Sequence, residues 1–166
     1  MKGLTIRLAE EPDRDVIRDV EARAFGGMGE AILVDSLVAA NDAVLELVAE
    51  REGEIIGHIL FSRVFVEAGK DRFPGVALAP AAVVPNWQGK GVGRALIDEA
   101  HKRLRASGEK LSIVLGDPAY YGRFGYEHGR AAGFASTYQC EALQAIAWGE
   151  APETGKLVYA TPFGAL

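Results

Sequence analysis

The sequence has little of what several classes of protein require. Its 166 residues include a single cysteine, Cys140, which excludes an internal disulfide, and without a neighbouring histidine we expect it to be a small buried apolar residue rather than a nucleophile. No apolar run approaches the roughly 18 residues of a membrane-spanning helix, and no signal-peptide pattern opens the chain. The three histidines, His58, His101 and His128, lack the spacing of metal ligands. We therefore expect a cytoplasmic protein with no membrane segment and no metal site.

Positive charge is also scarce, with 18 Lys and Arg against 23 Asp and Glu and a net charge of −5. This balance disfavours a nucleic-acid partner, because phosphate backbones bind basic surfaces. Residues 1–60 hold six basic and thirteen acidic residues, a balance of −7, whereas residues 61–166 have a balance of +2. Two interpretations of the acidic part stay open: a solvated helix face, or an acidic mouth that attracts a cationic substrate.

What the chain does have is the composition of a compact domain. Apolar residues make up 49% and charged residues 25%, both ordinary globular values, and the length suits one domain over residues 1–166. Alternating and β-rich segments predict strands over residues 4–9, 45–50, 55–66, 76–85, 110–115 and 156–160. Helical spacing predicts helices over 12–25, 30–40 and 92–106, a short one from 118, and a helical turn or two over 142–147. This order fits an α/β sandwich with helices on both faces of a mixed, mostly antiparallel sheet.

One predicted strand, 76–85, contains Pro80 near its middle. Proline has no backbone N–H and therefore does not donate to a strand ladder. We expect a bulge or poor pairing at this point, which leaves backbone groups free for another partner.

The most informative stretch follows that strand and reads NWQGKGVGRALIDEAHKRL, from Asn86 to Leu104. Glycines let a backbone approach a ligand closely, and the start of a helix presents unpaired N–H groups at its positive dipole end. With Lys90 and Arg94 beside them, the glycines predict a phosphate site, and so dense a cluster favours a diphosphate.

Several phosphate and nucleotide motifs are excluded by spacing. A P-loop needs a glycine where Val84 stands, and the dinucleotide fingerprint meets Arg94 or Leu96 at its last position. A methyltransferase-like G-x-G-x-G does match the glycines, and Asp117 follows the next strand, where an acid that binds ribose is wanted. A methyltransferase that uses S-adenosylmethionine therefore stays as an alternative.

The pattern Gln88-x-x-Gly91-x-Gly93, after a strand and before an amphipathic helix, resembles the acetyl-CoA signature of the GNAT superfamily of N-acetyltransferases. The later YYGRFGY resembles a second motif of that family, with Tyr121 standing four residues before Gly125 and its aromatic neighbour. GHILFS and the closing LVYATPF resemble a bacterial branch whose substrates are often unassigned. The resemblance implies two splayed central strands and acetyl-CoA as co-substrate. It also implies which residues bind the cofactor: Ala82, Val83 and Val84 along the pantetheine arm, and Gln88, Gly89, Lys90, Gly91, Val92, Gly93 and Arg94 around the diphosphate.

The same resemblance implies that acetyl passes directly to a primary amine of a small molecule or peptide. Tyr121 is the expected donor of a proton to the leaving thiolate, its neighbour Tyr120 is expected to be structural, and the backbone near Val83 is expected to meet the oxyanion. For the general base three options remain: Glu67 at the end of a strand, His58 within that strand, or a chain of water molecules.

The acceptor is expected to lie against the N-terminal helices and a loop reading EAGKDRFPG. Because the base is unassigned, a module that binds acyl-CoA as a sensor without turnover is the second functional hypothesis.

Overall fold

The computed structural model describes residues 2–165, and its centre is one eight-stranded sheet. The strand order is β1-β2-β3-β4-β5-β7, with β8 beside β3 and β6 beside β8. All pairs are antiparallel except β4–β5 and β6–β8. The strands are β1 (Leu4–Leu8), β2 (Ala43–Arg51), β3 (Glu54–Ala68), β4 (Asp71–Val83), β5 (Leu111–Leu115), β6 (Phe134–Ala135), β7 (Leu143–Ala147) and β8 (Gly155–Tyr159). The predicted mixed, mostly antiparallel sheet is therefore confirmed.

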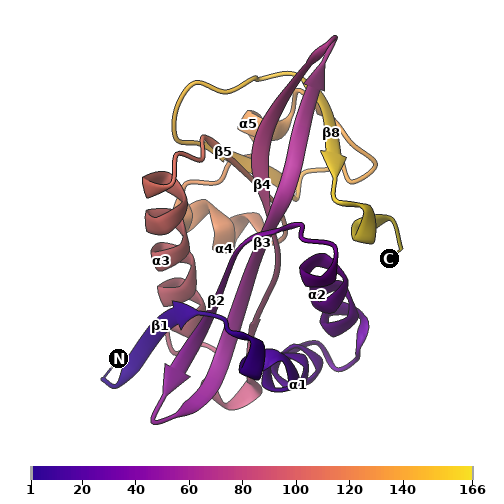
Figure 1. The fold of residues 1–166 in the computed structure, drawn as a ribbon. Coiled ribbons are helices and arrows are strands. Elements are labelled where there is room, and N and C mark those ends of the chain that lie inside the picture. The colour runs from indigo at the N-terminus through magenta and orange to yellow at the C-terminus, as the bar shows by residue number, and fades with distance from the viewer. Residues whose placement is uncertain (1, 166) are drawn as a thin grey trace.

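Helices cover both faces of this sheet (Figure 1). The helices are α1 (Arg14–Phe25), α2 (Gly29–Ala39), α3 (Val92–Ala106), α4 (Pro118–Tyr121) and α5 (His128–Ala131). Successive side chains of a strand point to opposite faces. On β3, His58 therefore faces α1, while Gly57 faces α3 so closely that a Cβ there would lie 3.0 Å from Val92. The predicted apolar stripe of α3 is buried along its length.

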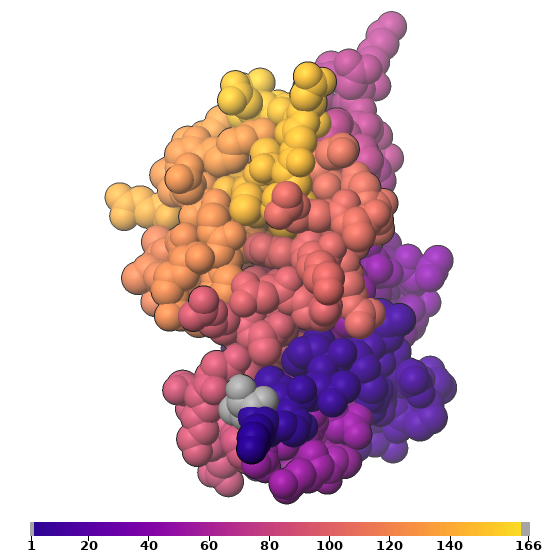
Figure 2. Space-filling model, turned by 90° about the vertical axis from the view of Figure 1, so that its left-hand side faces the viewer, coloured from indigo at the N-terminus to yellow at the C-terminus, as the bar shows by residue number. Residues whose placement is uncertain are grey.

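The long hairpin of β3 and β4 crosses the molecule and ends in a tip that stands out from the surface (Figure 2). One half of β3 pairs with β2, and residues 64–67 pair with β8 instead. The segment EAGKDRFPG, expected to be a loop, belongs mostly to strands β3 and β4. Ala68 pairs with Asp71, so that only Gly69 and Lys70 form the turn between them. Phe65, Phe73 and their neighbours add enough β-formers to extend both strands to the turn.

The sheet opens between β4 and β5. Their parallel pairing runs from Val76 to Leu78 and then stops, so the edge of β4 from Ala79 to Val83 has no strand beside it on that side. Next to this point the register with β3 shifts, with one extra residue of β4 between Leu78 and Ala81. The expected bulge at Pro80 and the two splayed strands are both confirmed.

Two expectations for the last third of the chain are wrong. The stretch 142–147 forms no helical turns, because its residues 143–147 pair as strand β7 with the free edge of β5 from Leu111 to Leu115. Cys140 is exposed rather than buried, since it lies in the turns that lead into β7. Within residues 2–165, no helix has both the length and the apolar character that crossing a membrane requires.

Candidate active site

The glycine-rich loop ends on the N-terminus of α3. Gly91 precedes the helix with φ of +88°, a left-handed conformation that side chains other than glycine rarely adopt. Glycine is required at position 93 for a steric reason, because a Cβ there would lie 2.7 Å from the hydroxyl oxygen of Tyr120. The Gln88 side chain donates a hydrogen bond of 2.9 Å to the Val83 carbonyl and ties the loop to the end of β4. The start of α3 therefore lines a cleft, and the hydrogen bond of Gln88 holds the loop in place beside it.

This cofactor cleft has a volume of about 480 Å³ and lies beside the unpaired edge of β4. Seven of the residues expected to bind the cofactor line it: Ala82, Val83, Gln88, Gly89, Gly91, Gly93 and Arg94. The side chains of Val84 and Val92 are instead buried in the core, and the Lys90 ammonium lies 5.1 Å from the centre of the Trp87 ring. The structure thus brings most of the sequence motif together around one space.

Two arginines give the cleft its charge. Arg94 belongs to the first turn of α3, and Arg123 lines the same cleft, with its guanidinium 4.8 Å from the centre of the Tyr120 ring. Sequence reasoning missed Arg123, although it stands inside the YYGRFGY motif. Two cations and a helix N-terminus suit a ligand with more than one negative charge.

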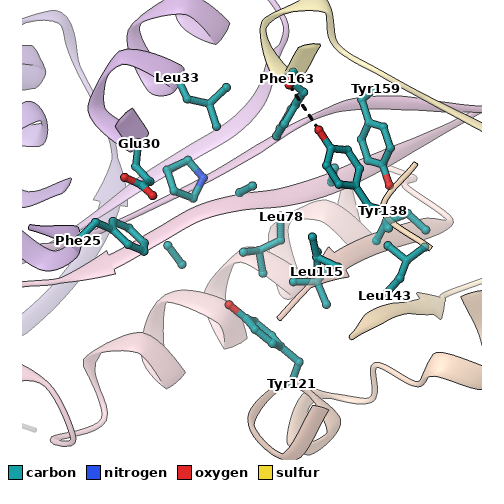
Figure 3. Close-up of a pocket in the computed structure, with 16 residues that line it drawn as sticks. Phe25, Glu30, Leu33, Leu78, Leu115, Tyr121, Tyr138, Leu143, Tyr159 and Phe163 are labelled. Carbon is teal, nitrogen blue, oxygen red and sulfur yellow. Dashed lines mark hydrogen bonds between the residues drawn. The ribbon is translucent and has the colours of Figure 1, made fainter. Parts of the chain in front are cut away.

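A second space has a volume of about 440 Å³ and lies between α2, the open part of the sheet and the C-terminal segment (Figure 3). We call it the acceptor cavity because the acceptor is expected beside the N-terminal helices. Its walls are mostly apolar, and Glu30 is the single charged side chain among the described residues that line it. The lining residues are Phe25, Glu30, Leu33, Ala77, Leu78, Ala79, Pro80, Ala81, Ile113, Val114, Leu115, Tyr121, Tyr138, Leu143, Tyr159 and Phe163. Phe25 at the end of α1 and two residues of α2 belong to these walls, as expected for the acceptor side, whereas neither residue of the turn between β3 and β4 lines them.

Tyr121 connects the two spaces, because its side chain lines both the cofactor cleft and the acceptor cavity. Its ring is held by edge contacts with Tyr120 at 5.0 Å and Tyr126 at 6.0 Å between ring centres. Figure 3 shows its hydroxyl pointing into the acceptor cavity. Burial raises the pKa of Tyr121 to about 12, so the phenol is protonated at neutral pH.

Glu67 makes its side-chain contact away from both spaces. Its carboxylate is 3.4 Å from Arg72 across the β3–β4 hairpin, both side chains are well exposed, and neither space is lined by it. Glu30, at the start of α2, is the carboxylate that the acceptor cavity does contain. The sequence carried no motif around Glu30, and only the expectation that the N-terminal helices border the cavity pointed toward it.

His58 is fully buried, on the face of the sheet that α1 covers. Its Nδ1 lies 2.6 Å from Glu21 and its Nε2 lies 2.7 Å from Glu46, which also pairs with Arg14. Burial lowers the pKa of His58, but the two carboxylates outweigh it and the net shift is upward. Both ring nitrogens contact carboxylates and the side chain lines neither space, so His58 does not suit the role of general base.

The methyltransferase alternative loses the support that the position of Asp117 gave it. The Asp117 carboxylate accepts a hydrogen bond of 3.0 Å from the N–H of Ala119 and caps α4. A carboxylate used in this way is the ordinary start of a helix. None of the described residues forms a group of His, Cys, Asp and Glu able to hold a metal ion.

Comparison with known proteins gives the family. A family model described as "Acetyltransferase (GNAT) domain" matches residues 5–129. Over 125 residues the chain is 42% identical to the uncharacterized N-acetyltransferase YjhQ of Escherichia coli K12, covering 74% of this chain and 69% of that protein. It is 38% identical over 125 residues to the uncharacterized N-acetyltransferase YhbS of the same strain, covering 75% of this chain and 74% of YhbS.

Solved structures agree over nearly the whole length. A GNAT family acetyltransferase from Brucella melitensis, in complex with acetyl-CoA, has a TM-score of 0.82 and 34% identity, covering 96% of this chain and 97% of that one. YhbS from Escherichia coli, in complex with CoA, has a TM-score of 0.88 and 30% identity, covering 97% of this chain and 92% of that one. Together with the family match and the arrangement of cleft, cavity and Tyr121, they establish that the chain belongs to the GNAT family of acetyltransferases.

Proposed function

We propose that the protein transfers the acetyl group of acetyl-CoA directly to a primary amine, with Tyr121 as the acid that protonates the leaving thiolate. The observation that carries this proposal is the position of Tyr121, whose side chain lines both the cofactor cleft and the acceptor cavity. The acetyl-CoA and CoA complexes of the two structural relatives support the choice of cofactor.

The cofactor cleft supplies the binding groups that the proposal needs. The N–H groups at the start of α3, with Arg94 and Arg123, would hold the diphosphate of CoA. The unpaired edge of β4, from Ala79 to Val83, would pair with the amide groups of the pantetheine arm. The thioester would then enter the opening between β4 and β5, where the acceptor cavity begins.

In the proposed reaction the amine nitrogen attacks the thioester carbonyl, a C–N bond forms and the C–S bond breaks. Backbone N–H near Val83 would stabilise the oxyanion of the tetrahedral intermediate. Before the attack the amine, bound as an ammonium ion, gives one proton to Glu30, the carboxylate of the acceptor cavity. Tyr121 then protonates the leaving thiolate, and the second proton, which the nitrogen loses as the amide forms, returns Tyr121 to the phenol. Glu67 is not part of this proposal because its carboxylate pairs with Arg72 on the hairpin.

The test is the Tyr121→Phe variant, assayed by CoA release and by acetyl-CoA binding. General acid catalysis typically contributes about 10²–10⁴-fold to a rate, so we expect kcat to fall by about that factor while the Kd for acetyl-CoA changes little. Tyr120→Phe is the matched control, because it removes a hydroxyl from the cofactor cleft alone, and it should act on acetyl-CoA affinity rather than on kcat. An unchanged kcat in Tyr121→Phe would contradict the proposal.

A sensor that binds acyl-CoA without turnover is the second functional hypothesis, and its prediction differs. In a sensor, Tyr121→Phe leaves the function intact and the wild-type protein releases no CoA with any amine. Thermal shift with acetyl-CoA and with S-adenosylmethionine tests the cofactor separately, since a ligand that binds the native state raises Tm.

A further inference from the structure

The chemistry of the acceptor cavity restricts the amine that fits it. At one end Figure 3 shows Glu30 beside Phe25, and at the other end Tyr138, Tyr159 and Phe163 form an aromatic group. The Tyr138 and Tyr159 rings make an edge contact with 5.3 Å between their centres, and the Tyr159 and Phe163 rings are tilted with 5.8 Å between theirs. A ligand that spans the cavity therefore meets one negative charge and a rigid apolar surface.

Glu30 is the only source of charge in this cavity among the described residues. The cavity has no Lys, Arg or His in its lining, and Glu30 forms no ion pair with any residue from 2 to 165. A carboxylate in a mostly apolar space favours a cation and disfavours a second anion. The cavity thus accommodates one ammonium group and offers no partner for an acid.

The other acidic side chains of residues 1–60 do not line the cavity. They are largely paired with basic residues, as in Arg18–Asp35 at 2.6 Å and Arg23–Asp19 at 3.6 Å. Specificity for a cation would therefore depend on Glu30 itself and not on the balance of −7.

Two of the three tyrosine hydroxyls in the walls have partners within the chain, and the proposed reaction uses the third, that of Tyr121. Tyr138 donates its hydroxyl hydrogen to the Phe163 carbonyl at 3.4 Å, and the Tyr159 hydroxyl lies 3.3 Å from that of Ser136. A sugar or polyamine placed here would leave its own polar groups unpaired, which is unfavourable in a buried site.

Apolar surface, by contrast, is left uncovered at the edge of the cavity. Phe25 is 48% exposed and Leu115 is 49% exposed, although both line the cavity. An apolar ligand body that covers such side chains gains the hydrophobic contribution of their burial.

We propose that the acceptor is a primary amine with a single positive charge, carried on a compact apolar body about the size of an aromatic ring, and that Glu30 binds its ammonium group. The volume of about 440 Å³ lies in the usual range of roughly 300–1,000 Å³ for small-molecule sites. This inference rests on the proposed acetyl transfer and names the substrate class of the same site.

The test compares four amines at saturating acetyl-CoA: 2-phenylethylamine, ethylamine, phenylalanine and spermidine. We expect kcat/KM for 2-phenylethylamine to exceed that of each of the others by on the order of 10-fold or more, because it alone combines one charge with an apolar ring. A higher kcat/KM for phenylalanine or spermidine would overturn the assignment of the substrate class and leave acetyl transfer standing. Absence of CoA release with every amine would overturn the proposed function and this inference with it.

Binding measurements separate the two proposals further, because they do not depend on turnover. Calorimetric titration of 2-phenylethylamine into the protein saturated with CoA should show binding that Glu30→Gln weakens about tenfold or more. Asp19→Asn removes an equal charge from the exposed face of α1, outside the cavity, and should leave the affinity for 2-phenylethylamine unchanged. Equal affinity in wild type and Glu30→Gln would show that Glu30 does not bind the amine.

The apolar contact has its own pair of variants. Phe25→Ala should raise KM for 2-phenylethylamine more than for ethylamine, whereas Met28→Ala, 51% exposed and outside the cavity lining, should change neither. Both side chains are exposed, so folding is not at stake. Equal effects of Phe25→Ala on the two amines would contradict an apolar body at this edge.

Discussion

The position of Tyr121 is open to a test that leaves Tyr121 itself unchanged. Gly116 follows β5, and a Cβ added there would lie 2.5 Å from Cε2 and 3.0 Å from Cδ2 of the Tyr121 ring. Ordinary contact begins at 3.4 Å, so the ring has to retreat by about 1 Å. A displacement of about 1 Å at a reacting group is able to lower a rate by about 10²-fold. We therefore expect Gly116→Ala to lower kcat by about that factor.

The assay is CoA release under saturating acetyl-CoA and acceptor, with acetyl-CoA Kd and Tm measured in parallel. Overpacking of this kind typically destabilises by about 1–3 kcal/mol, so Tm should fall while the protein still folds, and the untouched glycine-rich loop should keep acetyl-CoA affinity within a few-fold. Gly122→Ala is the matched control, because it lies one residue beyond Tyr121 with φ of −57° and has nothing within 4 Å of its added Cβ.

A double-mutant comparison decides whether the loss acts through the Tyr121 hydroxyl. If it does, Gly116→Ala has little further effect on kcat in the Tyr121→Phe background, since the two changes remove the same contribution. Full kcat in Gly116→Ala, or a loss of equal size in Gly122→Ala, would refute this reasoning.

Two further variants test the glycine-rich loop and the buried ion cluster. Gly93→Ala places a Cβ 2.7 Å from the Tyr120 hydroxyl oxygen but 3.9 Å from its ring carbon Cζ, so acetyl-CoA affinity should fall about tenfold by calorimetry. Tyr120→Phe removes the clashing atom, so in that background Gly93→Ala should change the affinity little relative to Tyr120→Phe alone. A tenfold loss in both backgrounds would show that the clash is not the cause. The folded-state pKa of His58 is raised above the unfolded value of about 6.5. The stabilisation from His58 is therefore fully present below pH 6.5 and is lost as pH rises through the folded pKa. Urea unfolding from pH 6 to 9 should show this loss in the wild type and not in His58→Gln, and parallel profiles of the two proteins would contradict it.

Most of the predicted residues that line the cofactor cleft could be named from the sequence because their signals are local. Gly91 and Gly93 stand within a few residues of the helix that they serve, and Pro80 marks the bulge in its own strand. Tyr121 was found through the spacing of its motif. In each case the chemistry is encoded by neighbours along the chain.

The acceptor side depends on contacts between distant segments, and there the sequence was a weaker guide. Glu30 becomes significant only because α2 lies opposite β4, β5 and the C-terminal Phe163. Residues 143–147 have a composition that suits a helix, and the free edge of β5 decides for a strand.

Buried charge was also beyond sequence reasoning. Glu21, Glu46 and His58 are separated by up to 37 residues, and only the packing of α1 on the sheet brings them within hydrogen-bond distance. Glu67 was one of three options for the general base because it was expected at the end of a strand, but the hairpin continues past it and its carboxylate pairs with Arg72.

The central claim is that acetyl-CoA bound in the cofactor cleft gives its acetyl group to an amine in the acceptor cavity. The most direct measurement is mass-spectrometric quantification of both products after incubation of the wild-type protein with acetyl-CoA and 2-phenylethylamine, followed by other primary amines. The account predicts CoA and N-acetylated amine in equal molar amounts, formed far faster than without protein. Tight binding of acetyl-CoA, with no CoA release above the protein-free rate for any amine, would contradict it.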